Sequence, residues 1–328
     1  MVKQEENIHR KKGGIYVGGY NDEMLFGELS EKWLENRRCN TKESTYMRYT
    51  EVIKLHILPH FSNYMVSDID TQALQSYLLF LINEKTLSKK TISDILVIIK
   101  SILKFGEQIN ARHNCLLSAV SIKPEKKEMR VFNYEEHKSL TEYLVSENSS
   151  SSAGMLIALY TGIRIGELCA LKYDDIDITS RKIHISKTMQ RIKQINGEGT
   201  HIHIDTPKSM SSIRDIPLTD FLYDIIISQK YKEGDYILTA SEKYVEPRTM
   251  QYRFSIITKK LGIKNATFHT MRHSFATRCV EAGFDIKTLS EILGHSNVNI
   301  TLDRYVHSSF NLKFLNMKKL DVYMNNLT

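Results

Sequence analysis

The chain has 328 residues, enough for two domains, and its 41% hydrophobic and 25% charged residues are ordinary for a globular protein. No apolar run approaches the ~20 residues that cross a membrane, and the polar residues 1–14 do not resemble a signal peptide. The net charge of +7 suits a polyanionic partner, but no segment forms a basic arm. The four cysteines form no CxxC pair, which predicts reduced thiols in a cytoplasmic protein.

Composition and periodicity divide the chain into four parts. Residues 1–20 form a flexible basic segment that is rich in glycine. Residues 21–118 form a helical domain, and residues 119–133, which have no apolar periodicity and contain Pro124, form a linker. Residues 134–328 form a second domain that ends in a tail helix, with apolar residues at helical spacing from Phe310 to Leu320.

The first domain is predicted to be nearly all helix. Pro59 should break the second of its helices. Apolar residues recur at helical spacing over residues 24–34, 46–57, 71–82 and 91–105.

A cationic helix start lies at Ser88-Lys89-Lys90-Thr91. Free N–H groups beside two lysines suit a phosphate group. A solvated, charged helix end is the alternative that these residues leave open.

The second domain is predicted to combine helices with one small antiparallel sheet, in an α+β arrangement that is mainly α. Lys208 is placed in the turn of the last hairpin of this sheet. The predicted helices are 134–146, 155–160 and 165–171, with a serine-rich loop at 149–152, and the predicted strands are 176–178, 182–186, 201–205 and 213–217.

The last third of the chain carries the most chemistry. His269 and Arg272 share one face of a helix that should stop at Gly283. Asp285 is predicted to cap a helix that Gly294 ends, which leaves His295 just beyond it. A final helix from about Asn297 carries Tyr305. A phenol, imidazoles and a guanidinium brought together could act on a phosphodiester as nucleophile, proton carriers and oxyanion clamp.

Each of these residues taken alone also has a structural explanation. Arg164 could pair with Glu167 three residues later, and Lys208 could be a solvated turn lysine. His269 and His273 have the spacing of a zinc pair, but the glutamate of HExxH is missing, so no metal site is expected. Tyr305 is one of 17 tyrosines.

Together the motifs resemble those of the tyrosine recombinases, the family of phage and conjugative-transposon integrases. Leu159-Tyr160-Thr161-Gly162-Ile163-Arg164-Ile165-Gly166-Glu167-Leu168 is similar to the first signature box of this family. Thr206-Pro207-Lys208-Ser209, followed by Arg214-Asp215-Ile216-Pro217-Leu218, resembles its lysine hairpin. His269-x-x-Arg272-His273-Ser274-Phe275-Ala276-Thr277, then Leu293-Gly294-His295 and Tyr305, match the second box in order and spacing.

The resemblance implies a catalytic set, which is Arg164, Lys208, His269, Arg272, His295 and Tyr305. In this family the tyrosine attacks the phosphodiester and becomes a 3′-phosphotyrosine, without a metal ion or any other cofactor. Arg164 and Arg272 would hold the nonbridging oxygens, and Lys208 would protonate the 5′ leaving oxygen. His269 would assist proton transfer at the tyrosine, and His295 would hydrogen-bond the phosphate.

The resemblance also implies a fold and partners. The two domains would form a C-shaped clamp on double-stranded DNA at specific core or attachment sites, and the protein would act as a homotetramer, with an excisionase or a bending protein as optional partners. The candidate DNA contacts are Lys89, Lys90, Thr91, Lys126, Lys127 and Arg248. The resemblance departs at the N-terminus, where residues 1–20 do not match the arm-site-binding domain of many transposon integrases.

The predicted function is site-specific DNA recombination for integration and excision of a mobile element. A chromosome-dimer resolvase of the same family, a type IB topoisomerase and a catalytically silent DNA-binding regulator are the alternatives. The sequence leaves open the attachment-site sequence and whether the tail helix packs on its own protomer or on a neighbour.

Overall fold

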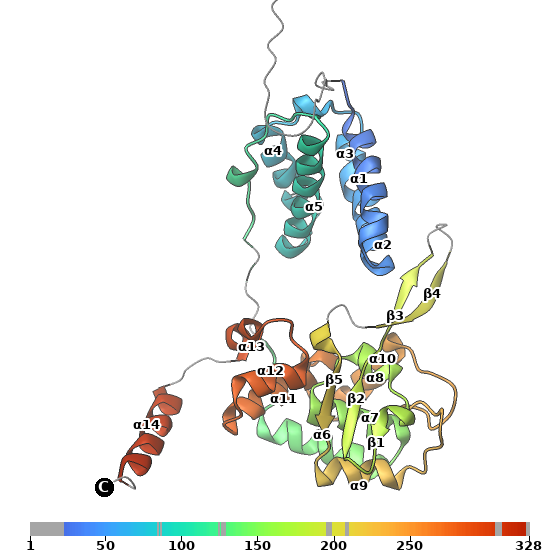
Figure 1. Ribbon diagram of the computed structural model, residues 1–328, viewed down its shortest axis with the longest axis vertical. Coiled ribbons are helices and arrows are strands. Elements are labelled where there is room, and N and C mark those ends of the chain that lie inside the picture. The colour runs from blue at the N-terminus through green and yellow to red at the C-terminus, as the bar shows by residue number, and fades with distance from the viewer. Residues whose placement is uncertain are drawn as a thin grey trace, which may run out of the picture. The chain divides into compact units, whose positions relative to one another are not determined.

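The computed structural model describes residues 23–83, 85, 87–123, 125, 129–194, 199–206, 210–305 and 310–325. These residues are mostly helical, as predicted, and they contain two small antiparallel sheets (Figure 1). The chain divides into two compact units, residues 1–127 and 128–328, each of which is described by itself. Within the described ranges, no helix is long and apolar enough to cross a membrane.

Unit 1 is a helical bundle with a continuous apolar core. Trp33, Ile57, Phe61 and Tyr77 are among its fully buried side chains. Ser88 caps the last long helix by accepting a hydrogen bond from the Thr91 N–H (3.1 Å). The main elements of the unit are α1 (Phe26–Asn40), α2 (Glu43–Val52), a π-helix (Ile53–Ile57), α3 (Leu58–Phe61), α4 (Thr71–Asn83) and α5 (Lys89–Gln108).

Pro59 does not break the second helix, which is a correction to the sequence prediction. The chain passes from α2 through the π-helix Ile53–Ile57 directly into α3, and it ends at Phe61. Pro59 occupies the first turn of α3, where its missing N–H and fixed φ are tolerated. The widened π turn before it is the local adjustment that keeps the helical path continuous.

Unit 2 is built around α7 (Ser150–Thr161), which is buried along nearly its whole length. Its sequence is apolar on all sides, as expected for a helix that neighbours surround. The predicted serine-rich loop is instead the start of this helix, because Ser149 caps it by accepting from the Ser152 N–H (3.2 Å). The other helices of the unit are α6 (Tyr134–Glu147), α8 (Ile165–Ala170), α9 (Asp220–Ser228), α10 (Pro247–Lys260), α11 (Phe268–Glu281), α12 (Ile286–Leu293), α13 (Val298–Tyr305) and α14 (Phe310–Asn325).

The strands of unit 2 form two sheets rather than the single predicted one. β2 (Lys182–Ile185) pairs with β1 (Ile176–Asp177) and with β5 (Arg214–Pro217). β4 (Thr200–Asp205) pairs instead with β3 (Thr188–Lys193), which the sequence analysis missed. The β3–β4 ribbon projects from the body of the unit (Figure 1). The segments 201–205 and 213–217 therefore do not form the predicted hairpin, and Lys208 lies outside the described residues.

Helices α11 to α13 form a separate cluster with its own small core. Asp285 caps α12 by accepting from the Thr288 N–H (2.9 Å), and Gly294 ends it in the left-handed conformation with φ +64°. Both ends of α12 and the helix that carries Tyr305 agree with the sequence prediction. Ala276, Cys279, Leu289, Leu293 and Tyr305 are buried together between the three helices.

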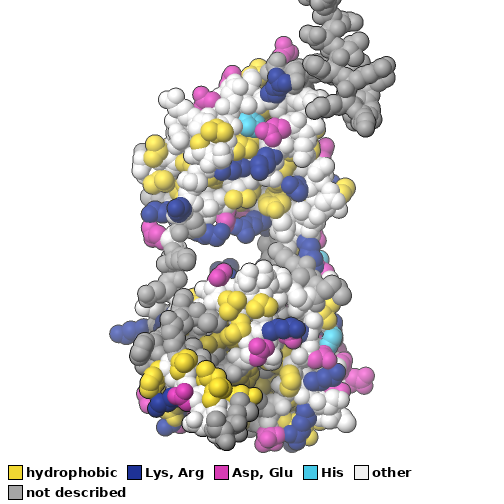
Figure 2. Space-filling view, turned by 60° about the vertical axis from the view of Figure 1, so that its left-hand side comes forward, with side chains coloured by type: hydrophobic (Ala, Val, Ile, Leu, Met, Phe, Trp, Pro, Cys, Tyr) yellow, Lys and Arg dark blue, Asp and Glu magenta, His cyan; other side chains and the backbone are white. Residues whose placement is uncertain are grey.

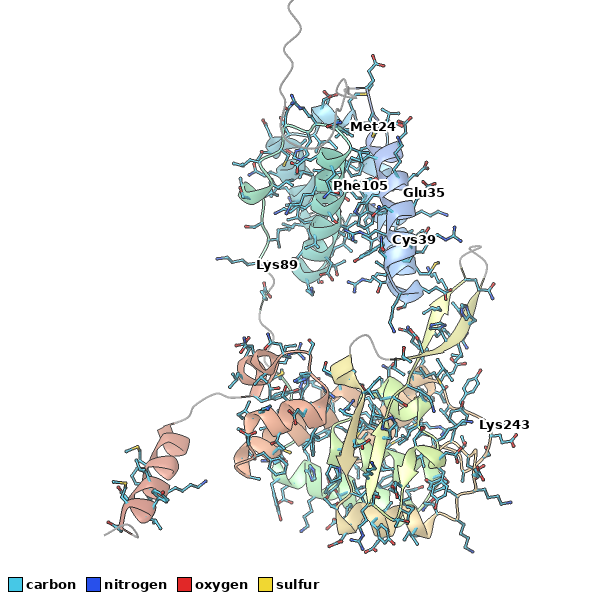
Figure 3. All side chains as sticks on the ribbon, in the orientation of Figure 1. Met24, Glu35, Cys39, Lys89, Phe105 and Lys243 are labelled. Carbon is cyan, nitrogen blue, oxygen red and sulfur yellow. The ribbon has the colours of Figure 1, made fainter. Side chains whose placement is uncertain are left out.

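The four thiols form no disulfide, and charges of both signs are present on the face that Figure 2 shows. Lys and Arg side chains are scattered among Asp and Glu side chains on the face that Figure 2 shows. All four cysteines are free thiols; three are buried, and Cys39 near the end of α1 is exposed (Figure 3). The buried cysteines behave as small apolar residues.

Candidate active site

Three arginines converge on the C-terminal end of α12. Arg214 donates from Nε to the carbonyl oxygen of residue 292 (2.5 Å), Arg272 from Nη2 to that of residue 293 (2.8 Å), and Arg164 from Nη2 to that of residue 294 (3.0 Å). The last carbonyl groups of a helix have no partner inside it and carry partial negative charge. The end of α12 therefore holds three cations side by side.

Glu167 lies between two of these arginines. It is 3% exposed, and its carboxylate accepts from Arg164 Nη1 (2.7 Å) and from Arg214 Nη2 (2.9 Å). It also accepts from the backbone N–H of Arg164 (2.9 Å), which fixes the first turn of α8. Burial opposes its ionisation, but Arg214 and then Arg164 outweigh burial, so the pKa of Glu167 is lowered. The carboxylate is thus a fixed anion that orients both guanidinium groups.

Arg272 is nearly fully buried at the start of α11. Besides the bond to residue 293, its Nη1 donates to the Gly162 carbonyl oxygen (2.7 Å). Burial, followed by the charge of Arg164, lowers the pKa of Arg272 to about 9, so it stays charged at neutral pH. A guanidinium has five N–H groups, and these two bonds leave three for an incoming anion.

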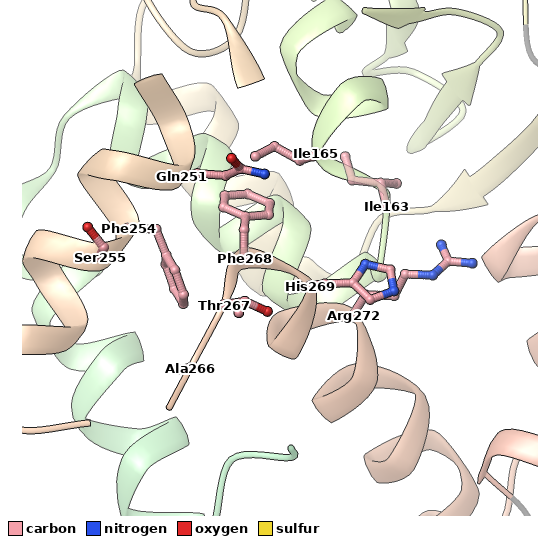
Figure 4. Close-up of a pocket in the computed structure, with 10 residues that line it drawn as sticks. All are labelled: Ile163, Ile165, Gln251, Phe254, Ser255, Ala266, Thr267, Phe268, His269 and Arg272. Atoms are coloured by element: carbon pink, nitrogen blue, oxygen red, sulfur yellow. The ribbon is translucent and has the colours of Figure 1, made fainter. Parts of the chain in front are cut away.

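His269 and Arg272 lie on the same side of α11 and line a pocket of about 490 Å³ (Figure 4). Its walls mix apolar and polar side chains, mostly from α8, α10 and α11. The pKa of His269 is lowered to about 4, mainly by partial burial and then by His273 and Arg272. The pocket therefore joins an uncharged imidazole to a fixed guanidinium. The lining residues are Ile163, Ile165, Gln251, Phe254, Ser255, Ala266, Thr267, Phe268, His269 and Arg272.

Tyr305 ends α13 and is 6% exposed. Its hydroxyl group forms a hydrogen bond with Nδ1 of His273 (2.9 Å). Its ring is parallel to that of His295, with ring centroids 6.4 Å apart and an interplanar angle of 3°. Burial raises the pKa of Tyr305, while the charges of Arg272 and Arg304 act in the opposite direction. The hydroxyl is therefore protonated at neutral pH and surrounded by groups that favour its ionised form.

His295 is held just after the end of α12, where the sequence places it. Its Nδ1 forms a hydrogen bond with the Thr301 hydroxyl group (2.8 Å), which fixes the orientation of the ring. Partial burial and then the charge of Arg272 lower its pKa to about 3. The imidazole is uncharged at neutral pH and can donate or accept a hydrogen bond.

The structure gathers five of the six predicted catalytic residues on α8 and α11 to α13. Arg164 and Arg272 meet at the α12 carbonyl groups, His269 contacts the ring of His273 at a centroid distance of 4.5 Å, and His295 faces Tyr305. The sixth, Lys208, lies outside the described residues. Two guanidinium groups, neutral imidazoles and a phenol in one cluster can bind a phosphate diester and attack its phosphorus atom.

Sequence reasoning missed two residues of this cluster, His273 and Arg214. The sequence analysis considered His273 only as the second histidine of a spacing typical of zinc sites. It considered Arg214 only as part of the motif Arg214-Asp215-Ile216-Pro217-Leu218. The signal for His273 was its position, four residues after His269 on the same helix face. No local pattern points to Arg214, because its partners Glu167 and residue 292 lie 47 and 78 residues away.

The candidate DNA contacts lie at exposed helix starts. Lys89 pairs with Glu125 (2.6 Å) and Lys90 with Asp94 (2.5 Å), and Lys89 projects from the first turn of α5 (Figure 3). Exposed ion pairs of this kind are weak, so they yield readily to a phosphate group. Thr91 hydrogen-bonds the cap residue Ser88, Arg248 is exposed in the first turn of α10, and Lys126 and Lys127 lie outside the described residues.

Two sequence families match the chain. The family described as "Phage integrase family" matches residues 129–311, more than half of the chain. The family described as "Phage integrase, N-terminal SAM-like domain" matches residues 25–82.

Curated relatives match along nearly the whole chain. A "Tyrosine recombinase XerC-like" protein of Caldanaerobacter subterraneus subsp. tengcongensis is 28% identical, over 93% of this chain and 84% of that protein. The "Integrase" of Staphylococcus phage L54a is 26% identical, over 94% of this chain and 95% of that protein.

Solved structures share the fold. The Tn1549 transposon integrase in complex with transposon right end DNA has a TM-score of 0.76 and 25% identity, over 91% of this chain and 100% of that chain. A lambda integrase tetramer bound to a Holliday junction has a TM-score of 0.65 at 15% identity, over 89% of this chain and 81% of that chain.

Proposed function

The chain belongs to the phage integrase family, and from this membership and the geometry of its site we propose that it is a tyrosine site-specific recombinase. It cleaves and rejoins DNA through a 3′-phosphotyrosine intermediate. The observation that carries the proposal is the position of Tyr305, whose hydroxyl group lies in one cluster with His273, His295 and Arg272.

In the proposed reaction, the Tyr305 oxygen attacks the scissile phosphorus and the P–O5′ bond breaks. The phosphate stays on the tyrosine, which conserves the bond energy, and a 5′-hydroxyl end is released. Attack by the 5′-hydroxyl of a second duplex on the phosphotyrosine then rejoins the strand. The chemistry needs neither a metal ion nor a nucleotide.

Arg164 and Arg272 bind the nonbridging oxygens in this proposal. A planar guanidinium donates two bonds at once and remains charged, which suits a phosphate that gains negative charge in the transition state. The carbonyl groups at the end of α12 already fix the orientation of both side chains, and Glu167 also holds that of Arg164. Such preorganised donors typically contribute ~10²–10³ in rate each.

The remaining predicted catalytic residues are His295, His269 and Lys208, and each has a role in the proposed reaction. His295 donates a hydrogen bond to the phosphate from its Nε2 side, because Nδ1 is engaged by Thr301. His269, on the pocket wall beside Arg272, assists proton transfer around Tyr305. Lys208 protonates the 5′ leaving oxygen.

The substrate is double-stranded DNA with specific core or attachment sites. A homotetramer binds it in the cytoplasm, and an excisionase or a bending protein is a further partner. Relatives named as a phage integrase and as a transposon transposase favour integration and excision of a mobile element. The XerC-like relative favours chromosome-dimer resolution as the second candidate. Membership of the phage integrase family sets aside the type IB topoisomerase.

Both units contribute DNA contacts in this proposal. Lys89, Lys90 and Thr91 contact the backbone from unit 1, and Lys126 and Lys127 follow it between the units. Arg248 lies one helical turn before Gln251 of the pocket, and thus on the same side of α10. Replacing a phosphate-contacting lysine or arginine by alanine should lower the slope of log affinity against log salt by about one.

A suicide substrate tests the proposed function. It is a duplex nicked near the crossover point that carries the recombination site from the flanks of the host element, and denaturing gels compare the wild-type protein with Tyr305→Phe. We expect a protein–DNA adduct with the wild-type protein and none with the variant. Tyr134→Phe, at an exposed tyrosine far from the site in sequence, is the matched control and should form the adduct.

The result that overturns the proposal is specific binding without an adduct by the wild-type protein, which would indicate the catalytically silent regulator. Chromosomal dimer sites in place of the element's flanks separate the two biological roles. Preferred cleavage of the chromosomal sites would make the protein a dimer resolvase.

A further inference from the structure

The Tyr305 hydroxyl group has a direct partner, Nδ1 of His273, at 2.9 Å. None of the roles assigned above uses this histidine. We propose that His273 accepts the phenolic proton of Tyr305 as the phosphodiester is attacked and returns it as the strand is rejoined. The inference rests on the proposed function, in which Tyr305 is the nucleophile.

Helix packing fixes this pair of residues. Tyr305 packs in one apolar cluster with Ala276 and Cys279, which follow His273 on α11. Residues 273 and 276 are three apart on that helix and share a face. The tyrosine ring therefore lies over the face of α11 from which His273 projects, and the hydrogen bond follows from the way α13 packs on α11.

The other two histidines of the cluster are engaged differently. His269 contacts the ring of His273 edge-on, with a centroid distance of 4.5 Å and an interplanar angle of 87°. His295 bonds Thr301 through Nδ1, and its ring lies parallel to that of Tyr305. His273 is thus the imidazole in line with the phenolic proton.

The charges around His273 favour a proton acceptor. The groups that face it are His269 and Arg272 of its own helix, and Tyr305 and Arg304 of α13. Partial burial, then Arg304 and Arg272, lower the pKa of His273 to about 4, so the ring is uncharged at neutral pH. In the tautomer that carries its proton on Nε2, Nδ1 accepts from the phenol.

Arg304, the neighbour of Tyr305 at the end of α13, adds positive charge near the phenol. Burial raises the pKa of Tyr305, while the charges of Arg272 and Arg304 act to lower it. Positive charge near the phenolic oxygen stabilises the negative charge that develops on it as His273 accepts the proton. The oxygen is thereby prepared for attack without a metal ion.

The proposed step balances in atoms and charge. The Oη–H bond of Tyr305 breaks and its proton moves to Nδ1 of His273, while the Oη–P bond forms and the P–O5′ bond breaks. The 5′ oxygen takes its proton from Lys208. On rejoining, the 5′-hydroxyl gives its proton back to Lys208 as the P–O5′ bond forms, while the Oη–P bond breaks and His273 returns its proton to the departing phenolate.

The test replaces His273 by asparagine, whose side-chain oxygen can occupy the place of Nδ1 and accept a hydrogen bond but cannot take up a proton at neutral pH. The rate of adduct formation on the suicide substrate is measured under single-turnover conditions. His184→Asn is the matched control, because His184 is a half-exposed histidine on β2 that pairs with Asp215. DNA binding by each variant is measured in the same buffer.

We expect His273→Asn to bind DNA like the wild-type protein and to cleave about 10²- to 10⁴-fold more slowly, the usual contribution of a general base. Its rate should rise with pH from about 6 to 8, because the phenol must then lose its proton to solvent. A substrate with sulfur in place of the 5′ bridging oxygen needs no acid at the leaving group, and it should not rescue the variant. The His184→Asn variant should match the wild-type rate.

Three results would overturn the inference. Cleavage by His273→Asn within about threefold of the wild-type rate would reduce His273 to a positioning residue. Rescue by the bridging sulfur would place its role at the leaving group. A wild-type rate that itself rises about tenfold per pH unit from pH 6 to 8 would show that no neutral base acts, and this measurement holds even where a variant fails to fold.

The proposed function fails separately from this inference. If the wild-type protein forms no adduct on any site that it binds, Tyr305 is not a nucleophile and both statements fall. A different outcome separates the two statements. If the wild-type protein forms the adduct and Tyr305→Phe does not, the proposed function holds. If His273→Asn then forms the adduct at the wild-type rate, only the role of His273 is wrong.

Discussion

At the scale of single residues, Glu167 decides how the arginines of the site are arranged. Its carboxylate is almost fully enclosed and bonds the guanidinium groups of Arg164 and Arg214, while those groups bind the carbonyl groups of residues 294 and 292 at the end of α12. A buried anion between two cations keeps like charges at a fixed separation. Without it, Arg164 and Arg214 would repel each other and lose their common orientation.

Replacing Glu167 by glutamine tests this arrangement. The amide keeps the shape but removes the charge and one acceptor, so we expect a loss of about 2–4 kcal/mol in the free energy of unfolding. Adduct formation should also fall by roughly 10²-fold, as when one oxyanion donor is lost. Urea unfolding and the suicide-substrate assay measure the two effects.

The control for this substitution is Glu246→Gln, which breaks the bidentate pair of Glu246 with Arg191. That pair is partly exposed, with side-chain exposures of 29% and 43%, so its loss should change the free energy of unfolding little and leave cleavage unchanged. Equal losses from both variants would contradict the role of Glu167.

The histidines give unit 2 a defined pH dependence. The pKa values of His269 and His273 are lowered to about 4, and that of His295 to about 3, from 6.5. The unfolded chain therefore binds more protons below pH 6.5, so this stability is full above pH 6.5 and is lost as the pH falls toward 4 and 3. Glu167, also lowered, loses its contribution only below 4.5.

We expect the unfolding midpoint of unit 2 to fall steadily between pH 6.5 and 4.5. The only tryptophan, Trp33, lies in unit 1, so its fluorescence follows unit 1 while far-UV circular dichroism follows both units. Replacing His273 and His295 by asparagine should flatten the pH dependence. An unchanged slope in that double variant would mean that His137, whose pKa burial also lowers, or other groups carry it.

Residue types and spacing predict most of the residues of the candidate catalytic cluster, but not the contacts between them. The spacing of His269 and Arg272 on α11 is local, so helix geometry alone puts both side chains in one pocket. The bond between His273 and Tyr305 joins two helices 32 residues apart in the chain, and it depends on how α13 packs on α11. Packing of that kind has no signature in a single sequence.

At the scale of elements, the left-handed end of α12 is the point on which the arginine cluster depends. Gly294 has φ +64°, and a Cβ atom at this position would lie 2.8 Å from Nη1 of Arg214 and 3.1 Å from its Cζ. Any side chain would be strained by the backbone and would also displace the guanidinium. Glycine here meets two requirements at once.

Gly294→Ala should therefore destabilise unit 2 by about 1–3 kcal/mol and reduce cleavage. Gly262→Ala is a matched control, because Gly262 has a similar φ of +69° but no atom within 4 Å of an added Cβ. It reports the backbone cost alone, so it should lower stability without slowing adduct formation. If both variants cleaved equally fast, the contact with Arg214 would be irrelevant to catalysis.

Elements were predictable where the local signal was strong. The α12 boundaries follow from an Asp cap and a Gly stop, and α4 from its apolar spacing. Pro59 was misjudged because a π turn before it keeps the helix continuous, which propensity does not reveal. β3 was missed, and β4 was paired wrongly, because strand pairing is set by contacts across the chain rather than by the strands themselves.

At the scale of the whole molecule, the net charge gives little information about a DNA-binding face, and the apolar pattern gives more about where the two units divide. Cations and anions both occur on the face that Figure 2 shows, and a net charge of +7 does not by itself mark a DNA-binding face. The boundary between the units, by contrast, falls after residue 127, within the segment that lacks apolar periodicity. Residues of this segment still reach both cores, since Val120 is buried in unit 1 and Phe132 in unit 2. The absence of apolar periodicity around Pro124 is therefore only a local signal of a linker.

Helix α14 carries exposed apolar side chains along its length. Phe314, Met317 and Leu320 are each about half exposed, at 52%, 59% and 48%, and they follow one another at helical spacing. We expect this apolar face to pack on a neighbouring protomer in the recombining tetramer. A chain that ends at residue 309 should then bind a single site and form the adduct, yet need roughly tenfold or more protein to assemble two sites, a loss of about 1.4 kcal/mol.

Gel-shift assays with one-site and two-site DNA distinguish assembly from binding. Lys319→Ala, an exposed change on the same helix, is the control and should assemble normally. Packing of α14 on its own protomer predicts the opposite pattern, because removal of the helix would then lower the unfolding midpoint of unit 2 and slow cleavage at a single site. A truncated chain that assembles two sites at the wild-type concentration would rule out packing on the neighbour, since the tetramer would not need the helix.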